Sequence, residues 1–208
     1  AGTQQVEAEV RRHFPTTRVV RWDRDTTRSV EDHEAKLRQF MDHEADVLVG
    51  TQMVAKGLDL PDVTLVGVVL ADYSLREGDF RAGERTFQLL VQVAGRAGRA
   101  ERDGRVIIQT LQPDHPAILA AATQDPDRFF EDELRWRAEH GYPPYTRLVR
   151  LQFSHPSLPY VAEEAHRLAG EIRDRAPSYP NIVVTGPTPP AIARLRGRHR
   201  LQILVFGD

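Results

Sequence analysis

The pattern of apolar positions in the first half of the chain changes repeatedly from a helical period to short dense runs. Val6, Val10 and Phe14 recur every four residues among charged neighbours, the spacing of a helix with one buried stripe. The runs ADVLVG and VTLVGVVL are apolar throughout, which favours strands buried on both faces of a sheet. In chain order the pattern predicts a helix over 4–14, a strand over 18–22, a helix over 30–42, strands over 45–50 and 63–70, a helix over 79–93 and a strand over 105–110.

Helices and strands that alternate in this way indicate βαβ units wound into a parallel sheet, so we expect an α/β domain. In open sheets of this kind, ligands bind beyond the carboxyl ends of the strands. Four residues directly follow two of the predicted strands: Thr51, Gln52, Asp72 and Tyr73. They are therefore candidates for contact with a ligand.

The pattern changes after Pro113. Two amphipathic stretches over 114–122 and 126–140 predict a helical connector, and the sequence GYPPY over 141–145 ends it because paired prolines cannot continue a helix or a ladder. The remainder predicts a strand over 148–153, a helix over 161–175, a strand over 181–185 and two further runs over 191–195 and 200–206. We expect a small β-α-β-β (α+β) domain, and the chain divides into residues 1–113, 114–141 and 142–208.

Composition excludes several kinds of site and one class of protein. The chain has no cysteine, which excludes disulfides and thiolate-bound zinc within it, and its scattered histidines do not indicate a metal site. No window is apolar enough to span a bilayer, so we expect an intracellular protein that does not enter a membrane. The net charge of −2 hides an asymmetry: residues 1–141 carry 19 Lys and Arg against 25 Asp and Glu, whereas residues 142–208 carry 9 against 5. The two ends therefore favour different partners.

The stretch QLLVQVAGRAGR carries two arginines, Arg96 and Arg99, at the end of an apolar run. The apolar residues predict a buried helix, and Gly95, Ala97 and Gly98 keep bulk away from the guanidinium groups. Because arginine presents a planar fork of charged donors, the pair suits a nucleotide phosphate. The alternative is a helix end capped by Gly98, whose cations face the negative end of the helix dipole.

Several strings resemble one family of enzymes. Residues 51–59 resemble motif V, and residues 92–99 (QVAGRAGR) resemble motif VI, of the second RecA-like lobe of superfamily 2 helicases. The strings GTQMVAKGLDLPDVTLVGVVLAD, DFRAGERTFQLLVQVAGRAGR, GYPPY and RLRGRHRLQILV are similar, in the same order, to the PriA family of replication-restart helicases. The resemblance covers nearly the whole chain. It implies a RecA-like parallel-sheet lobe in residues 1–113.

The motif V resemblance implies contacts with both DNA and nucleotide. Thr51 and Gln52 would touch the DNA phosphate backbone, Gly57 would lie near the nucleotide and Asp59 would face the ribose. From the residues alone, Thr51 could equally be a helix N-cap and Asp59 a turn former before a proline.

The motif VI resemblance implies that Gln92 lies between the DNA and nucleotide sites. Arg96 and Arg99 would be arginine fingers that reach the γ-phosphate of ATP. Without the resemblance, Gln92 is equally explained as a solvated helix residue.

This sequence departs from the family in what it lacks. It contains no phosphate loop and no acidic strand end for Mg²⁺, so ATP and Mg²⁺ are implied only for the full-length protein. The cysteine ligands of the family's zinc insertion are also absent. We therefore expect a fragment that does not hydrolyse ATP alone, because phosphoryl transfer needs both halves of the site. Two alternatives stay open: a non-catalytic fork-recognition scaffold that has lost its ATPase half, and a lobe of another superfamily 2 enzyme, against which the GYPPY and RGRHRLQ strings argue.

The C-terminal stretch carries four alternating arginines, Arg194, Arg196, Arg198 and Arg200, which would share one face of an extended strand. Such an edge suits DNA phosphates or an acidic peptide, and the alternative is a solvated arginine-rich hairpin. The resemblance implies that this domain binds branched DNA, and that Arg198 and Gln202 hold the acidic C-terminal tail of the single-stranded-DNA-binding protein. Tyr142 and Tyr145 could stack on unpaired bases or wedge a domain joint.

Taken together, the resemblance implies the C-terminal part of a primosomal DNA helicase. The full-length enzyme would recognise stalled forks, unwind DNA 3′ to 5′ with ATP and help to reload the replicative helicase. Its partners would be branched and single-stranded DNA, the single-stranded-DNA-binding protein and other primosome proteins, in the bacterial cytoplasm at the nucleoid.

Overall fold

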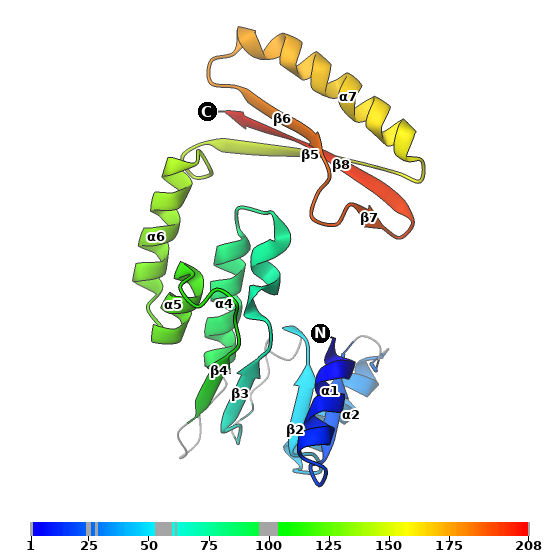
Figure 1. The fold of residues 1–208 in the computed structure, drawn as a ribbon, viewed down its shortest axis with the longest axis vertical. Coiled ribbons are helices and arrows are strands. Elements are labelled where there is room, and N and C mark those ends of the chain that lie inside the picture. The colour runs from blue at the N-terminus through cyan, green and yellow to red at the C-terminus, as the bar shows by residue number, and fades with distance from the viewer. Residues whose placement is uncertain are drawn as a thin grey trace. The chain divides into compact units, whose positions relative to one another are not determined.

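The computed structural model of the protein describes residues 2–23, 26–27, 29–52, 60, 62–95 and 104–207, with Glu77 described by its backbone only. The chain divides into two compact units (Figure 1). The first contains residues 1–72 and 87–113, and the second contains residues 73–86 and 114–208. The predicted division into three parts stays a prediction, since the second unit holds both the connector and the C-terminal sheet.

The first unit is built from helices and parallel strands, as the sequence predicts. Strand β1 pairs in parallel with β2, and β3 pairs in parallel with β4. Helix α4 begins in the second unit and continues into the first. The elements are α1 (Thr3–His13), β1 (Val19–Trp22), α2 (Val30–Met41), β2 (Val47–Gly50), β3 (Leu65–Val68), η1 (Ala71–Glu77), α4 (Ala82–Ala94) and β4 (Arg105–Ile108). Residues 73–77 of η1 belong to the second unit. The α/β fold class is confirmed.

Helix α2 begins where the sequence places a capping box. The Ser29 hydroxyl accepts a hydrogen bond from the Asp32 amide, and the Asp32 carboxylate accepts one from the Ser29 amide, each at 3.2 Å. One turn further, His33 accepts a hydrogen bond at its Nδ1 from the indole of Trp22, at 2.6 Å. Because Trp22 is buried on β1, this bond attaches the helix to the strand.

The prediction that residues 63–70 form a strand covered on both faces is wrong for the part of the chain that the structure describes. Leu65 and Gly67 are exposed, whereas Val66 and Val68 are half-buried. Val69, just after the strand, is 48% exposed. Apolar residues on both faces of a strand do not reveal which face is covered, so the sequence alone gave no sign of the open side.

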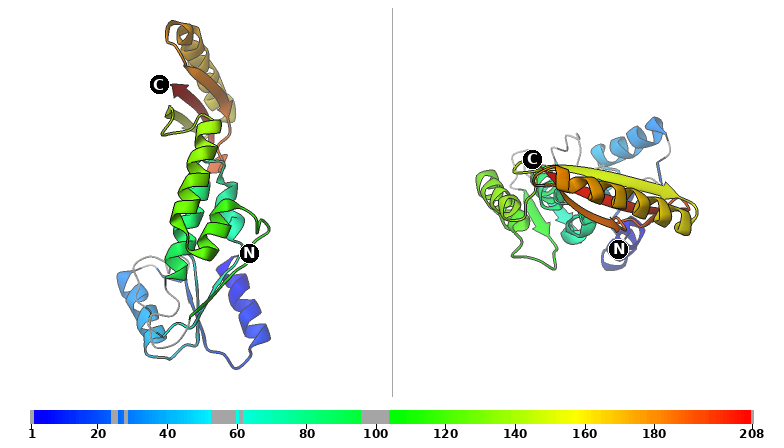
Figure 2. Two further views of the ribbon diagram at one scale, coloured as in Figure 1. Left: turned by 90° about the vertical axis from the view of Figure 1, so that its left-hand side faces the viewer. Right: turned by 90° about the horizontal axis from the view of Figure 1, so that it is seen from above.

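The second unit contains a helical pair and an antiparallel sheet. The sheet has the strand order β5-β8-β6, and the short β7 also pairs with β8. Helix α7 runs along one face of this sheet (Figures 1 and 2). The elements are α5 (Pro116–Thr123), α6 (Pro126–Glu139), β5 (Arg147–His155), α7 (Leu158–Arg175), η2 (Ala176–Ser178), β6 (Val183–Thr188), β7 (Arg194–Leu195) and β8 (Arg198–Gly207). The predicted β-α-β-β order is confirmed by β5, α7, β6 and β8, and the short β7 lies within the predicted run over 191–195.

Successive side chains of β8 alternate between the two faces of this sheet. Leu201 and Ile203 are buried, and Leu201 packs with Val161 and Ala165 of α7 in one hydrophobic cluster. Small alanines on α7 let the helix approach the sheet closely. Because successive side chains of a strand point to opposite faces, the even-numbered residues of β8, from Arg198 onward, lie on the face away from α7. We call this the open face.

Candidate functional site

Four of the predicted nucleotide-site residues lie outside the residues that the structure describes: Gly57, Asp59, Arg96 and Arg99. Their assigned roles at the nucleotide therefore stay predictions. Thr51 and Gln52 directly follow β2 and are exposed, and Gln92 is exposed on α4. No contact among these three residues is found in the described part of the chain, and their roles also stay predictions.

Asp72, the acidic residue that follows β3, serves the fold and not a ligand. It is 2% exposed. Its carboxylate accepts hydrogen bonds from the Thr110 hydroxyl at 2.6 Å, the Leu111 amide at 2.8 Å and the Gln112 amide at 3.1 Å. These donors, the Thr110 hydroxyl first, hold the pKa of Asp72 below its usual value. Asp72 thus fastens the carboxyl ends of β3 and β4 together.

The predicted shared face of the four alternating arginines is wrong for two of them. The chain reverses at Arg196 and Gly197, whose φ angles of 50° and 77° are those of a tight two-residue hairpin turn. Leu195 then pairs with Arg198, and Arg194 pairs with His199. Since cross-strand partners share a face, Arg194 lies on the α7 face with His199, and Arg196 lies in the turn. We call β7, this turn and the start of β8 the basic hairpin.

Arg198 and Arg200 do share the open face, and strand β5 holds both. The Arg198 guanidinium donates to the Ser154 hydroxyl at 3.1 Å and to the Ser154 carbonyl at 2.7 Å. Arg200 donates to the side-chain oxygen of Gln152 at 2.6 Å. Sequence reasoning missed Ser154 and Gln152, because only the β5–β8 register brings them beside the arginines.

The two predicted peptide-binding residues lie on the same face of the sheet, about 13 Å apart along β8. Arg198 and Gln202 are four positions apart on β8, so both side chains lie on the open face. Gln202 pairs across the sheet with Gln152 and with Thr188. The open face therefore presents two guanidinium groups followed by a cluster of amide and hydroxyl groups. Such groups can bind a carboxylate and donate hydrogen bonds to a peptide backbone.

In the C-terminal sheet and its helix, all the acidic residues lie on α7. The four strands contain five arginines and no aspartate or glutamate: Arg147, Arg150, Arg194, Arg198 and Arg200. Helix α7 carries four acidic residues, Glu163, Glu164, Glu171 and Asp174, against the three arginines Arg167, Arg173 and Arg175. Among the described residues, no ion pair joins the hairpin arginines to a carboxylate within 4.0 Å. The sheet therefore keeps a positive field for an anionic partner.

Tyr142 lies in a cluster of aromatic rings within the second unit. Its ring stacks on Phe80 with 5.2 Å between centroids and on Trp136 with 5.2 Å, and it meets Phe206 edge-on at 5.7 Å. These contacts occupy the ring of Tyr142, so the alternative of base stacking is wrong for this residue. Tyr145 is 52% exposed, and nothing in the structure assigns it a ligand.

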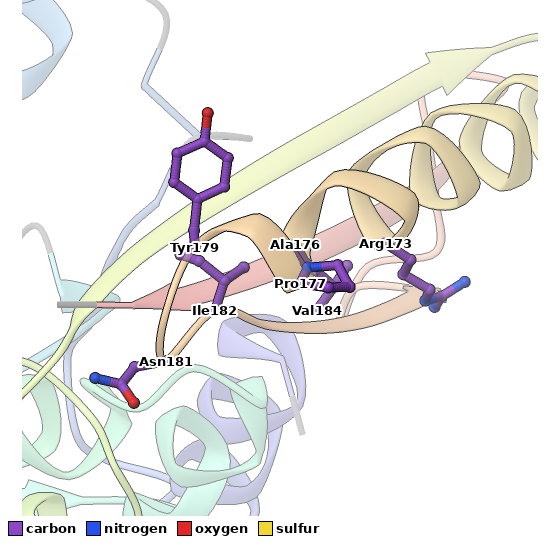
Figure 3. A pocket seen from close by; sticks show the side chains of 7 residues that line it. All are labelled: Arg173, Ala176, Pro177, Tyr179, Asn181, Ile182 and Val184. Atoms are coloured by element: carbon purple, nitrogen blue, oxygen red, sulfur yellow. The ribbon is translucent and has the colours of Figure 1, made fainter.

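A shallow hollow of about 310 Å³ lies where α7 ends and β6 begins (Figure 3). Figure 3 shows Arg173 and Asn181 at opposite ends of the hollow, and the ring of Tyr179 extends away from it. Arg173 already donates to the Gly186 carbonyl. The lining of the hollow contains no carboxylate or histidine.

In the part of the chain that the structure describes, no group of three or more His, Asp or Glu side chains is placed to hold a metal ion. No helix in the same part of the chain has the length and apolar character that crossing a membrane requires.

Comparisons with known proteins match the two parts of the chain to two families. Residues 4–101 match the helicase conserved C-terminal domain, and residues 138–208 match the primosomal protein N C-terminal domain. The chain is 45% identical over 204 residues to the replication restart protein PriA of Bacillus subtilis, covering 98% of this chain and 25% of the relative. It is 44% identical over 205 residues to PriA of Synechocystis, covering 99% of this chain and 24% of the relative.

A more distant relative has the same extent. PriA of Haemophilus influenzae is 36% identical over 208 residues, which cover 98% of this chain and 28% of the relative. The chain thus spans about a quarter of the length of these curated relatives. In all three, the similarity covers at least 98% of this chain and therefore includes both matched segments.

Proposed function

This chain belongs to the PriA family of replication restart proteins, and from that membership we propose that it forms the C-terminal part of an ATP-dependent DNA helicase. The observation that supports this is the similarity of 45% over 98% of the chain, which includes the helicase segment and the primosomal segment together. The full-length protein would recognise stalled forks, unwind DNA 3′ to 5′ and help to reload the replicative helicase. It would act in the bacterial cytoplasm, at the nucleoid.

In this proposal, the first unit supplies one side of a nucleotide site. Arg96 and Arg99 would donate to the γ-phosphate of ATP, and Gly57, Asp59 and Gln92 would line the same site. ATP and Mg²⁺ would be held by a phosphate loop that this sequence does not contain. Thr51 and Gln52, exposed at the carboxyl end of β2, would bind DNA phosphates.

Hydrolysis assays test the catalytic half of the proposal. The 208-residue chain alone should show no DNA-stimulated release of phosphate from ATP. The full-length protein should hydrolyse ATP when DNA is present, and Arg99→Ala should reduce the rate by about 10³-fold, since arginine fingers contribute about 10³ to 10⁵ in kcat. Turnover by the chain alone, or an Arg99→Ala enzyme with the parent's rate, would contradict the proposal. A full-length protein without ATPase activity would identify it as a scaffold.

The open face of the second unit would bind the acidic C-terminal tail of the single-stranded-DNA-binding protein. Arg198 would pair with a carboxylate, and Gln202 would hydrogen-bond the peptide backbone. A titration with this tail peptide at low salt should show weaker binding for Arg198→Ala and for Gln202→Ala. Arg167→Ala is the matched control, because Arg167 lies on α7 and pairs with Glu164 and Glu171 there. Equal affinity of all variants would remove the assignment.

A further inference from the structure

A row of three basic side chains crosses the sheet on the α7 face at the base of the basic hairpin. His199 on β8 pairs with His155 on one side and with Arg194 on the other. Side chains in such a row share a face and lie about 5 Å apart. The three side chains therefore form a continuous basic strip, although His155 is far from Arg194 and His199 in the sequence.

An exposed aromatic ring lies beside this strip. Tyr160 is in the first turn of α7, which begins at Leu158, three residues after β5 ends. Its ring centroid is 4.4 Å from that of His155, and the residue is 53% exposed. An aromatic surface next to cations is the combination with which proteins bind unpaired bases and their phosphates.

The hairpin carries cations on both faces and at its turn. Arg198 and Arg200 lie on the open face, attached to Ser154 and Gln152 of β5. Arg194 lies on the α7 face, and Arg196 is exposed in the turn between them. The hairpin thus separates two positively charged surfaces, and the exposed ring of Tyr160 lies beside the α7-side surface.

We propose that Arg194, Arg196, His199, His155 and Tyr160 form a binding site for single-stranded nucleic acid, distinct from the peptide-binding open face. Arg194 and Arg196 bind phosphates of the strand, and one unpaired base stacks on Tyr160. An acidic peptide would leave the tyrosine unused, and a duplex would keep its bases stacked inside the helix. The inference rests on the proposed function, in which the protein acts on DNA.

The test measures binding of a fluorescein-labelled oligothymidylate to the 208-residue chain by anisotropy at several salt concentrations. Arg194→Ala should weaken binding and reduce the slope of log affinity against log salt by about 0.7, the value for one phosphate contact on a single strand. Tyr160→Ala should weaken binding about fivefold or more with the slope unchanged. Tyr160→Phe should restore the affinity, because its ring still stacks.

The matched control is Arg198→Ala, which removes a cation from the other face of the same hairpin. It should keep the parent's affinity for the oligothymidylate and lose affinity for the acidic tail peptide, whereas Arg194→Ala should do the opposite. Circular dichroism confirms that each variant is folded. An oligouridylate in parallel shows whether the site prefers DNA to RNA.

Three outcomes would each contradict a different part of the proposal. If Arg198→Ala weakens oligothymidylate binding as much as Arg194→Ala does, the separate site is wrong. If the parent binds the tail peptide and not the oligothymidylate, the site is also wrong, while the peptide assignment stands. If the parent binds neither ligand, the proposed role of the whole C-terminal sheet fails.

Discussion

The guanidinium of Arg137 on α6 lies 2.9 Å from the carboxylate of Glu84 in the first turn of α4. It also donates to Glu133 at 2.8 Å and lies over the ring of Phe80 at 5.0 Å. Although burial opposes the charge, these carboxylates raise the pKa of Arg137 above its usual value. One side chain therefore joins the connector helix to the start of α4 within the second unit.

We expect Arg137→Ala to lower the free energy of unfolding of the second unit by about 2 kcal/mol, because it leaves two carboxylates without this partner. The fluorescence of Trp136 in urea reports this unit, since the other tryptophan of the chain is Trp22 in the first unit. Arg135→Ala on the same helix is the control. Arg135 has one exposed ion pair with Asp132, so its removal should change stability by less than about 0.5 kcal/mol.

Asp72 predicts an acid dependence of the first unit. Its pKa is lowered in the folded state, so its contribution to stability is full above the unfolded value of about 3.9 and is lost as pH falls through the folded value. Asp72→Asn places an amide donor against the donors that the carboxylate accepts. The variant should be less stable than the parent at pH 7, and the difference should shrink as pH falls below about 4. Trp22 fluorescence in urea measures it, and a difference that is constant with pH would contradict the interpretation.

Ile203 is fully buried on β8, beneath α7. Ile203→Ala should lower the free energy of unfolding by about 3 kcal/mol, through lost burial and the cavity that remains. Val149→Ala on β5 is the matched control, because Val149 is 54% exposed and its truncation should cost far less. Equal losses for the two variants would show that α7 does not cover the sheet as described.

The ring of Tyr142, and not its hydroxyl, should stabilise the aromatic cluster of the second unit. Tyr142→Phe keeps the stacks on Phe80 and Trp136 and should leave the unfolding midpoint of the second unit nearly unchanged. Tyr142→Ala should lower the midpoint and shift the emission of Trp136 to longer wavelength, because more of the indole, which is 39% exposed in the parent, then meets water. An unchanged spectrum for Tyr142→Ala would mean that the stack does not form in solution.

Most helices and strands could be predicted from the sequence, because their signals are local. The helix over 126–140 is observed as α6, and the dense run over 105–110 contains β4. The capping residues and prolines that bound these elements lie within a few residues of the hydrophobic pattern that defines them.

Pairing between distant residues could not be predicted in the same way. The alternation of Arg194 to Arg200 suits one extended strand, whereas the two predicted runs leave room for a hairpin between residues 195 and 200. The positive φ angles of Arg196 and Gly197 place the reversal at these two residues. The sequence does not indicate that an arginine such as Arg196 will adopt a positive φ angle. The contacts of Arg198 with Ser154, and of His199 with His155, follow from the register of strands more than forty residues apart.

The four strands of the second unit contain arginines and no acidic residue, and this affects how the protein behaves during purification. A net charge of −2 would lead a biochemist to expect binding to an anion exchanger at neutral pH. The local field of the acid-free strands predicts instead that the chain is retained by heparin or phosphocellulose at low ionic strength and elutes as salt screens it. Preparations made without a high-salt wash should carry nucleic acid, visible as excess absorbance at the wavelength of the bases.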